Sequence, residues 1–399
     1  MNMRILIALV SAVAVISGGA YFFSQERQAL QSEAYTGGPL LPDLQARVNN
    51  VDAVRLQSQE GGVINLVRQG GIWVVKDHYN YRANPDRVSI LLKQVATLEK
   101  IEPKTAKPQN HARLNLDDPA GENALGTRIT LKANGEEVAD VVIGLVSPPD
   151  HGGGTFVRLF SEDQTWLAKD EVKPRRRLLD LLDRSVVNVD GRRIRSVHIQ
   201  RSAVKNDEKE PIIISKETPS QDKYNLSASI PAGFQPKADH ELSSIARVPD
   251  FMVLEEVKPA TDLKWDHPVE TIFETFDGLR LTFRSAVQKD GKVWSSVAAA
   301  TTNRSLNLDD YIVANKAADT EAGRIAGQMK TPEELAEEVK LWASRLNGWA
   351  YRLTDYKAKR LTATSQEVIE KPEAAERSGT RSEEHTSELQ SPCNLVCRL

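Results

Sequence analysis

The chain has 399 residues, of which 40% are hydrophobic and 27% charged, and its formal net charge is -3. This balance does not fit an intrinsically disordered chain, which combines low hydrophobicity with high net charge. The 52 basic and 55 acidic residues show no basic excess of the kind that nucleic-acid-binding proteins carry, so no nucleic-acid partner is predicted. The length allows two or three domains of about 100–200 residues each.

Residues 1–23 are predicted to form an N-terminal membrane anchor. Ile5 to Phe23 contain no charged residue, and about 20 apolar residues suffice to cross a bilayer as a helix. Arg4 precedes this run, and positive charge tends to remain on the cytoplasmic side. The pattern predicts a single-pass inner-membrane protein with its body in the periplasm. A cleaved signal peptide is the alternative, because Gly18 and Ala20 are small enough for a cleavage site.

Residues 24–46 read as a polar linker, and residues 47–186 as a first α+β unit. Alternating apolar residues predict strands, and Asn134-Gly135 between two such runs is typical of a hairpin. Asn84 followed by Pro85 predicts the start of a helix, with Asn84 as the cap. A second helix is expected over 173–182, with Pro174 near its start.

Residues 187–372 repeat this pattern and are interpreted as a second, related α+β unit. Asp277-Gly278 occupies the hairpin position of Asn134-Gly135, and the segment from Trp349 resembles the segment from Thr165. A helical insertion is expected at about 301–348, where Thr331 and Glu334 have the spacing of a capping box. Its apolar stripe either packs on its own unit or faces a partner. The predicted fold class is therefore α+β: an N-terminal transmembrane helix, then two tandem related units of antiparallel sheet with packed helices.

Residues 373–399 are predicted to be a disordered tail. From about Arg381 onward, the tail resembles translated adapter DNA at the end of a genomic contig. Both cysteines, Cys393 and Cys397, lie in this segment. A body without cysteine is compatible with an oxidising periplasm.

One segment of the chain weakly resembles a catalytic motif. His151-Gly152-Gly153-Gly154 resembles the oxyanion loop of lipase-like hydrolases, but no G-x-S-x-G motif accompanies it. The seven histidines lack metal-ligand spacing, and no phosphate-binding glycine motif occurs. We therefore predict no enzyme activity, no catalytic, cofactor-binding or metal-binding residues and no cofactor. A hydrolase that uses the His151 loop remains as an alternative.

Two further patterns have no assigned role. The sequence LNLDD occurs at 114–118 and again at 306–310. Arginines gather between 175 and 195, where they form either a solvated face paired with nearby acids or a contact for anionic lipid or an acidic partner. The seven are Arg175, Arg176, Arg177, Arg184, Arg192, Arg193 and Arg195.

Several short motifs resemble family 4340 of the domains of unknown function. They are the G-x-W strand end at 71–73, the A-N-P-D helix start at 83–86, the L-x-L-D-x-P turn at 114–119, the hairpin ending near Ile143-Gly144 and the W-x-A strand end at 166–168. The resemblance covers Val48 to Ser185 well and the second unit loosely. The chain departs from the family at Asn115, where glycine is usual, which leaves the geometry of that turn open.

The resemblance implies a single-pass protein with a large extracytoplasmic part, linked to gliding-motility-type ABC transporters. We therefore expect a non-enzymatic accessory protein that contacts the membrane and ABC permease or ATPase subunits. The oligomeric state stays undefined. A periplasmic protein that binds lipid or glycan in a cleft between the two units is the main alternative.

Overall fold

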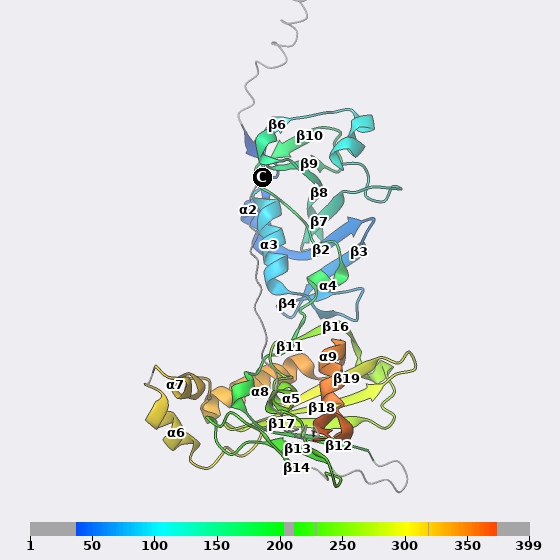
Figure 1. Cartoon of the computed structure of the whole chain (residues 1–399). Coiled ribbons are helices and arrows are strands. Elements are labelled where there is room, and N and C mark those ends of the chain that lie inside the picture. Colours follow the sequence, from blue (N-terminus) through cyan, green and yellow to red (C-terminus); the bar gives the residue numbers. More distant parts are fainter. Residues whose placement is uncertain (1–36, 203–210, 228–229, 318, 373–399) are drawn as a thin grey trace, which may run out of the picture.

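The computed structural model describes residues 37–202, 211–227, 230–317 and 319–372. These residues form a mixed α+β structure in which helices pack on two large antiparallel sheets (Figure 1). In this part of the chain, no helix is long and apolar enough to cross a bilayer. The predicted anchor (1–23), most of the linker and the tail (373–399) lie outside the described residues.

The first sheet is built from ten strands, and every neighbouring pair is antiparallel. Its order is β1 (Gly38–Pro39), β6 (Glu99–Pro103), β10 (Thr165–Ala168), β9 (Thr155–Leu159), β8 (Glu136–Val146), β7 (Thr127–Ala133), β2 (Val51–Ser58), β3 (Gly62–Gln69), β4 (Ile72–Val75) and β5 (Tyr81–Arg82). The predicted hairpin joins β7 to β8, and Asn134 and Gly135 both have positive φ, as a tight hairpin turn requires.

One long helix, α3 (Pro85–Ala96), packs on the core of the first sheet. Its start is as predicted: the Asn84 side chain accepts a hydrogen bond from the Arg87 backbone N–H at 3.0 Å. Val88, Leu91 and Val95 point into the core, with the spacing of an amphipathic helix. The shorter helical pieces around this sheet are α2 (Leu44–Arg47), η1 (Val48–Asn50), η2 (Pro108–Leu114), η3 (Pro149–His151) and α4 (Leu178–Leu181).

The second sheet is built from nine strands, again antiparallel throughout. Its order is β11 (Ser185–Val187), β16 (Met252–Pro259), β20 (Trp349–Leu353), β19 (Val293–Thr301), β18 (Leu279–Val287), β17 (Val269–Thr275), β12 (Ile194–Arg201), β13 (Ile212–Ser215) and β14 (Asn225–Ser227). A small third sheet pairs β15 (Gln235–Pro236) with β21 (Ile369–Glu370).

Eight neighbouring strands have the same order in both large sheets. The run β6-β10-β9-β8-β7-β2-β3-β4 in the first sheet corresponds to β16-β20-β19-β18-β17-β12-β13-β14 in the second. Each strand therefore has the same neighbours and the same rank along the chain. Helix α5 (Asp239–Ala246) precedes β16 as α3 precedes β6.

The chain between β19 and β20 is helical, with α6 (Leu308–Asn315), α7 (Glu321–Ala326) and α8 (Pro332–Leu346). The Thr331–Glu334 capping box is present at the start of α8. Leu335, Trp342 and Leu346 are buried in the main core, and α8 contacts β19. Its apolar stripe therefore packs on its own sheet, and the alternative of a partner-facing stripe on this helix is wrong. The other elements here are η4 (Gly191–Arg193), η5 (Ala260–Asp262), α9 (Asp355–Leu361) and α10 (Ser365–Val368).

A buried ion network connects these helices to the second sheet. Asp277, in the turn between β17 and β18, is fully buried, and Arg193 is 3% exposed. Arg193 binds the Asp277 carboxylate at 2.9 Å and also Glu338 of α8 at 3.2 Å. The backbone N–H of Lys330 donates to Asp277 at 2.9 Å. A buried carboxylate needs such partners because desolvation otherwise penalises its charge.

The two sheets meet at an aromatic contact. The ring of Tyr81, from β5, packs edge-on against Trp349 of β20 with centroids 4.8 Å apart. Beside it, Asp183 binds Arg345 of α8 at 3.0 Å, and the Tyr81 hydroxyl donates to the Asp183 carbonyl at 3.3 Å. Apolar burial and an ion pair therefore act together at this contact.

The predicted helix over 173–182 is wrong for most of its length. Residues 171–177 form neither helix nor strand, and only α4, Leu178–Leu181, is helical. Val172 is buried in the core, and the Arg176 side chain donates to the buried Thr127 hydroxyl at 3.0 Å. These two contacts hold the segment along the sheet. Repulsion among the three successive arginines also disfavours a helix here.

Replacing Asp277 by alanine should lower the free energy of unfolding by about 3 kcal/mol, because the buried Arg193 loses the closer of its two carboxylate partners and the Lys330 N–H loses its acceptor. The measurement is urea denaturation of the full-length chain in detergent. Asp266→Ala is the matched control, since Asp266 is exposed in the same half of the chain. An Asp277→Ala variant as stable as the Asp266→Ala control would contradict the structural role of the network.

Acid should weaken the contact between the sheets through His78. This ring lies beside β16, where burial lowers its pKa more than the nearby Glu256 and a hydrogen bond to the Val257 backbone raise it. Because the folded state binds the proton less readily than the unfolded state, stability is present above the ordinary pKa of 6.5 and falls as the pH drops below it. Thermal unfolding of wild type and His78→Gln at pH 7 and pH 5 measures this. The variant should lose less stability between the two pH values, and an equal loss would exclude His78 as the cause.

Candidate functional site

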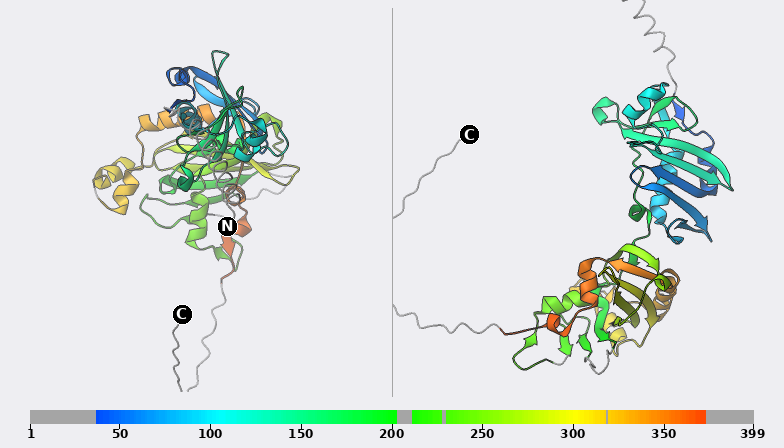
Figure 2. Two further views of the ribbon diagram at one scale, coloured as in Figure 1. Left: turned by 90° about the horizontal axis from the view of Figure 1, so that it is seen from above. Right: turned by 90° about the vertical axis from the view of Figure 1, so that its right-hand side faces the viewer.

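Helices α6 and α7 form an arm that projects from the side of the second sheet (Figures 1 and 2). The arm has its own small core, made of Phe276, Leu308, Ile325 and Met329, with Tyr311 and Ile312 packed against it. This cluster is distinct from the main core. Outside it, Leu306 is 93% exposed and Val313 83% exposed.

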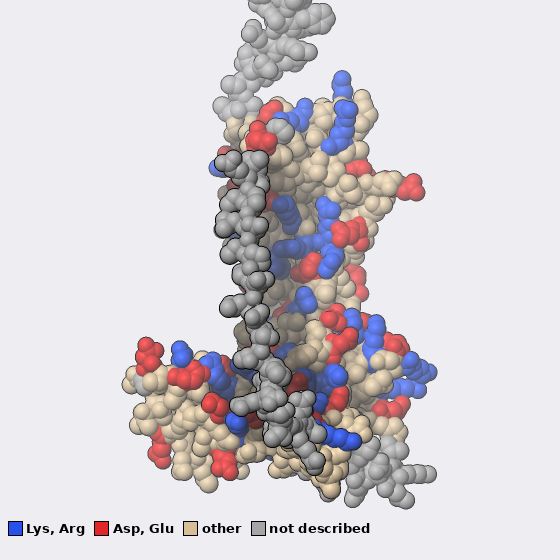
Figure 3. Space-filling view, in the orientation of Figure 1, with Lys and Arg blue, Asp and Glu red and all other residues tan. Residues whose placement is uncertain are grey.

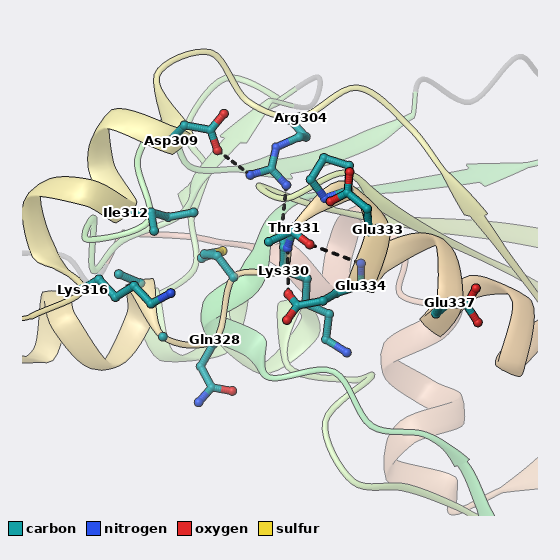
Figure 4. A pocket seen from close by; sticks show the side chains of 14 residues that line it. Arg304, Asp309, Ile312, Lys316, Gln328, Lys330, Thr331, Glu333, Glu334 and Glu337 are labelled. Atoms are coloured by element: carbon teal, nitrogen blue, oxygen red, sulfur yellow. Dashed lines mark hydrogen bonds and ion pairs between the residues drawn. The ribbon is translucent and has the colours of Figure 1, made fainter.

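A cavity of about 880 Å³ lies between the arm and the start of α8 (Figure 4). We call it the arm cavity. Ile312, Ala326 and Met329 give it an apolar wall, whereas Lys316 on the arm and Glu337 on α8 lie on opposite sides. A volume of this size accommodates a substantial ligand or several side chains of a partner.

The central charge of the arm cavity is already paired. Arg304 binds Asp309 at 2.7 Å and donates to the Lys330 carbonyl at 2.6 Å (Figure 4). Lys330 in turn binds Glu338 at 2.8 Å. These pairs hold the arm against the sheet and the α8 start. Beside these pairs, the apolar wall of Ile312, Ala326 and Met329 offers surface for binding by shape and apolar contact.

The His151 loop is a tight turn between β8 and β9. The backbone N–H groups of Gly152 and Gly153 donate to the carbonyls of Pro149 and Pro148, at 3.2 and 3.0 Å. An oxyanion site needs N–H donors that point at the reacting atom, and here two of them are used within the turn. Gly154 has a φ of +90°, and a Cβ on it would lie 2.1 Å from the Ala168 carbonyl oxygen. The glycines therefore have a structural explanation.

The arginines that gather in the sequence do not gather in space as one patch. Arg192, Arg193 and Arg195 bind Asp190, Asp277 and Glu274 respectively, and Arg184 donates to the Leu254 carbonyl. Arg177 pairs with Asp180 at 3.6 Å. The expected pairing with nearby acids is thus found for Asp180, whereas Asp183 pairs with Arg345 and Arg82 instead.

Residues 173–177 still border a groove of about 550 Å³, together with Gly144, Leu145 and Asn115. Arg175 is exposed on it, and Arg176 is tied to Thr127. The hypothesis of a contact with anionic lipid or an acidic partner now concerns Arg175 and Arg177 rather than the whole stretch.

The two LNLDD copies share a local conformation but not a place in the fold. Asn115 and Asn307 both adopt left-handed backbone, with φ of +57° and +61°, and the leucine after each is buried. The first copy lies between β6 and β7, and the second between β19 and β20. At Asn115 the turn keeps the conformation for which glycine is the usual residue, because asparagine tolerates left-handed backbone better than other side chains.

The histidines of the described region are dispersed. His111 is buried against the Asp163 carbonyl at 2.8 Å, and His198 lies on β12. Among the residues that the structure describes, no three His, Cys, Asp or Glu side chains are grouped to hold a metal ion. His385 and the side chain of His151 lie outside this description.

A comparison of two glycine substitutions tests the structural reading of the His151 loop. Gly154→Ala should destabilise the protein by several kcal/mol, because the new methyl group meets backbone that has little room to move. Gly153→Ala, at a φ of +62° and with its nearest atom at 4.0 Å, should cost only about 1 kcal/mol. Thermal unfolding of the two variants measures the difference, and equal destabilisation would contradict the close packing at Gly154.

A family model described as a domain of unknown function (DUF4340) matches residues 73–264. No curated protein and no solved structure showed significant similarity. The match starts later than the resemblance read from the motifs and extends further into the second sheet. It contains Trp73, the Asn84 helix cap and the L-x-L-D-x-P turn, and it ends before the arm. By this match, residues 73–264 of the chain belong to the DUF4340 family.

Proposed function

We propose that this chain is a non-enzymatic accessory protein that acts through protein–protein contacts, made mainly by the arm. The observation that carries the proposal is the exposure of Leu306 and Val313 on an element that projects from the body. Much of the arm face visible in Figure 3 is uncharged. Large apolar side chains at 93% and 83% exposure gain free energy when a partner covers them, at about 25 cal/mol per Å².

The position of the arm in the chain supports this role. The two large sheets share an eight-strand order, and we infer that they are two tandem related units, 47–186 and 187–372. In the first unit, the connection between β9 and β10 is a short turn, whereas α6, α7 and α8 occupy the equivalent connection between β19 and β20 in the second unit. The arm is therefore an addition to a shared framework, and additions of this kind commonly carry function.

We propose that the partner is an ABC-type transport or envelope system. The apolar run from Ile5 to Phe23 supports anchoring in the inner membrane, with the body in the periplasm. We propose that in this location the arm contacts a periplasmic part of a permease subunit, and the ATPase subunits would co-purify through the permease. The resemblance of the motifs to membrane-anchored proteins linked to such transporters also favours this partner.

Crosslinking in native membranes tests the proposal. A photoreactive amino acid at Leu306 or Val313 of the full-length chain should give adducts with a permease subunit, identified by mass spectrometry. The same probe at Val287, which is 65% exposed at the end of β18, is the matched control and should give few adducts.

The double variant Leu306→Asp/Val313→Asp should reduce co-purification of that partner by about tenfold or more, since truncating a central apolar contact costs about 2 kcal/mol and 1.4 kcal/mol is tenfold. Val287→Asp should leave co-purification unchanged. An undiminished partner yield from the double variant would exclude the arm as the contact. Absence of any transport subunit from the wild-type sample would exclude the transport role.

A further inference from the structure

A second cavity, of about 380 Å³, is bordered by α7 and by the segments around Lys216 and Arg247. Four separate parts of the chain line it: η4, the loop from Lys216 to Tyr224, the end of α5, and α7. We call it the lysine cavity after its most buried charge. Its lining includes three cationic side chains, Arg192, Lys216 and Arg247.

Lys216 is a buried ammonium group without a carboxylate partner in the described structure. It is 6% exposed, and its Nζ donates to the Pro219 carbonyl at 3.2 Å. The rings of Tyr224 and Phe276 face the same nitrogen, with centroids at 5.3 and 5.7 Å. An ammonium group has three donors, so one carbonyl leaves it poorly satisfied. Burial accordingly lowers the pKa of Lys216 below its ordinary value.

Arg247 provides the second charge. Its side chain packs against Gly191, where an added Cβ would lie 2.6 Å from the Arg247 Cγ. The absence of a side chain at position 191 thus makes room for the arginine. Arg247 lies close enough to Lys216 for their like charges to lower the Lys216 pKa further. No ion pair of Arg247 is found within the described residues.

The acidic groups of this cavity are only partly available to these two cations. Glu321 binds Arg324 at 2.8 Å and Arg192 at 3.4 Å, and Arg192 is held by Asp190 on its own turn. Asp222 attracts Lys216 but lies on the exposed loop and makes no direct pair with it in the described structure. Asp190, like Asp222, attracts Lys216 across space at least as strongly as Arg247 repels it, but no ion pair joins either carboxylate to the Lys216 ammonium in the described structure. The Lys216 ammonium therefore borders the cavity without a carboxylate in contact with it.

We propose that the lysine cavity binds a small molecule through its phosphate group, held between Lys216 and Arg247. An oxyanion placed there would supply acceptors for the unused ammonium donors and would remove the repulsion between the two cations. Phosphate suits the pair because it accepts several charge-assisted hydrogen bonds and matches the fork of a guanidinium group. The volume of about 380 Å³ is in the range of small-molecule sites. This inference is independent of the proposed partner contacts of the arm.

Inorganic phosphate is the first probe, titrated into the full-length chain in detergent while thermal unfolding is followed. Ligand that binds only the folded state raises the unfolding temperature in a concentration-dependent way. Chloride at equal ionic strength controls for screening. General stabilisation by excluded anions should appear equally in wild type and in every variant.

Lys216→Met and Arg247→Gln should each weaken phosphate binding by about tenfold or more, since one hydrogen bond to a charged group is worth about one decade of affinity. Lys223→Met is the matched control: Lys223 lies on the same loop, but its side chain is 73% exposed and pairs with Asp239. It should bind phosphate as the wild type does. Arg247 is exposed, so Arg247→Gln should fold. Phosphate binding can therefore still be measured on this variant if replacement of the buried Lys216 impairs folding.

Mixed micelles that contain phosphatidylglycerol distinguish the source of the phosphate group. A Lys216-dependent shift with both the lipid and inorganic phosphate would assign the cavity to a lipid headgroup. A shift with inorganic phosphate alone would assign it to a free phosphorylated molecule. A phosphate effect of equal size in wild type, Lys216→Met and Arg247→Gln, or no effect at all, would overturn the proposal.

Discussion

The fully buried carboxylate of Asp277 is the interaction on which the architecture of the second sheet depends. It binds Arg193 from η4, directly before β12, and the backbone N–H of Lys330 from the chain that leaves the arm. Through Arg193 the network reaches Glu338 on α8. One charge therefore connects a strand, a hairpin turn and the helical insertion. Because buried charges tolerate few alternative arrangements, the network also defines where the arm leaves the sheet.

The corresponding hairpin in the first sheet has a different chemistry. Asn134 and Gly135 complete the turn between β7 and β8 through backbone conformation, and the Asn134 N–H donates to the Asp52 carboxylate at 2.9 Å. This turn has no helical insertion to hold. The turn at Asn134 needs only an exposed hydrogen bond. The turn at Asp277 also holds the helical insertion, and it does so through a buried ion network.

The two cavities beside the arm differ in their electrostatics. In the arm cavity, Arg304 and Lys330 already bind Asp309 and Glu338. These two cations are therefore less available to a ligand, and the apolar wall offers the main binding surface. In the lysine cavity, Lys216 binds a neutral carbonyl and approaches aromatic rings. Both cavities share α7 or the chain next to it.

The sequence by itself determined the local elements that depend on short-range chemistry. The Asn84 cap, the Asn134-Gly135 hairpin and the Thr331–Glu334 capping box each occur as predicted, because each is complete within a few residues. The mixed α+β class and the family also followed from patterns along the chain. The expected helix at 173–182 failed where Val172 and Arg176 found partners on the sheet.

Only the tertiary structure decided which charges are buried, paired or left over. Adjacent arginines such as Arg192 and Arg193 bind different acids, and the partners of Arg193 lie 84 and 145 positions away. The lysine cavity likewise joins four segments that carry no shared motif. Lys216 looks like any other lysine in the sequence, because desolvation and Coulomb interaction depend on neighbours in space, and the packing of distant strands and helices chooses those neighbours.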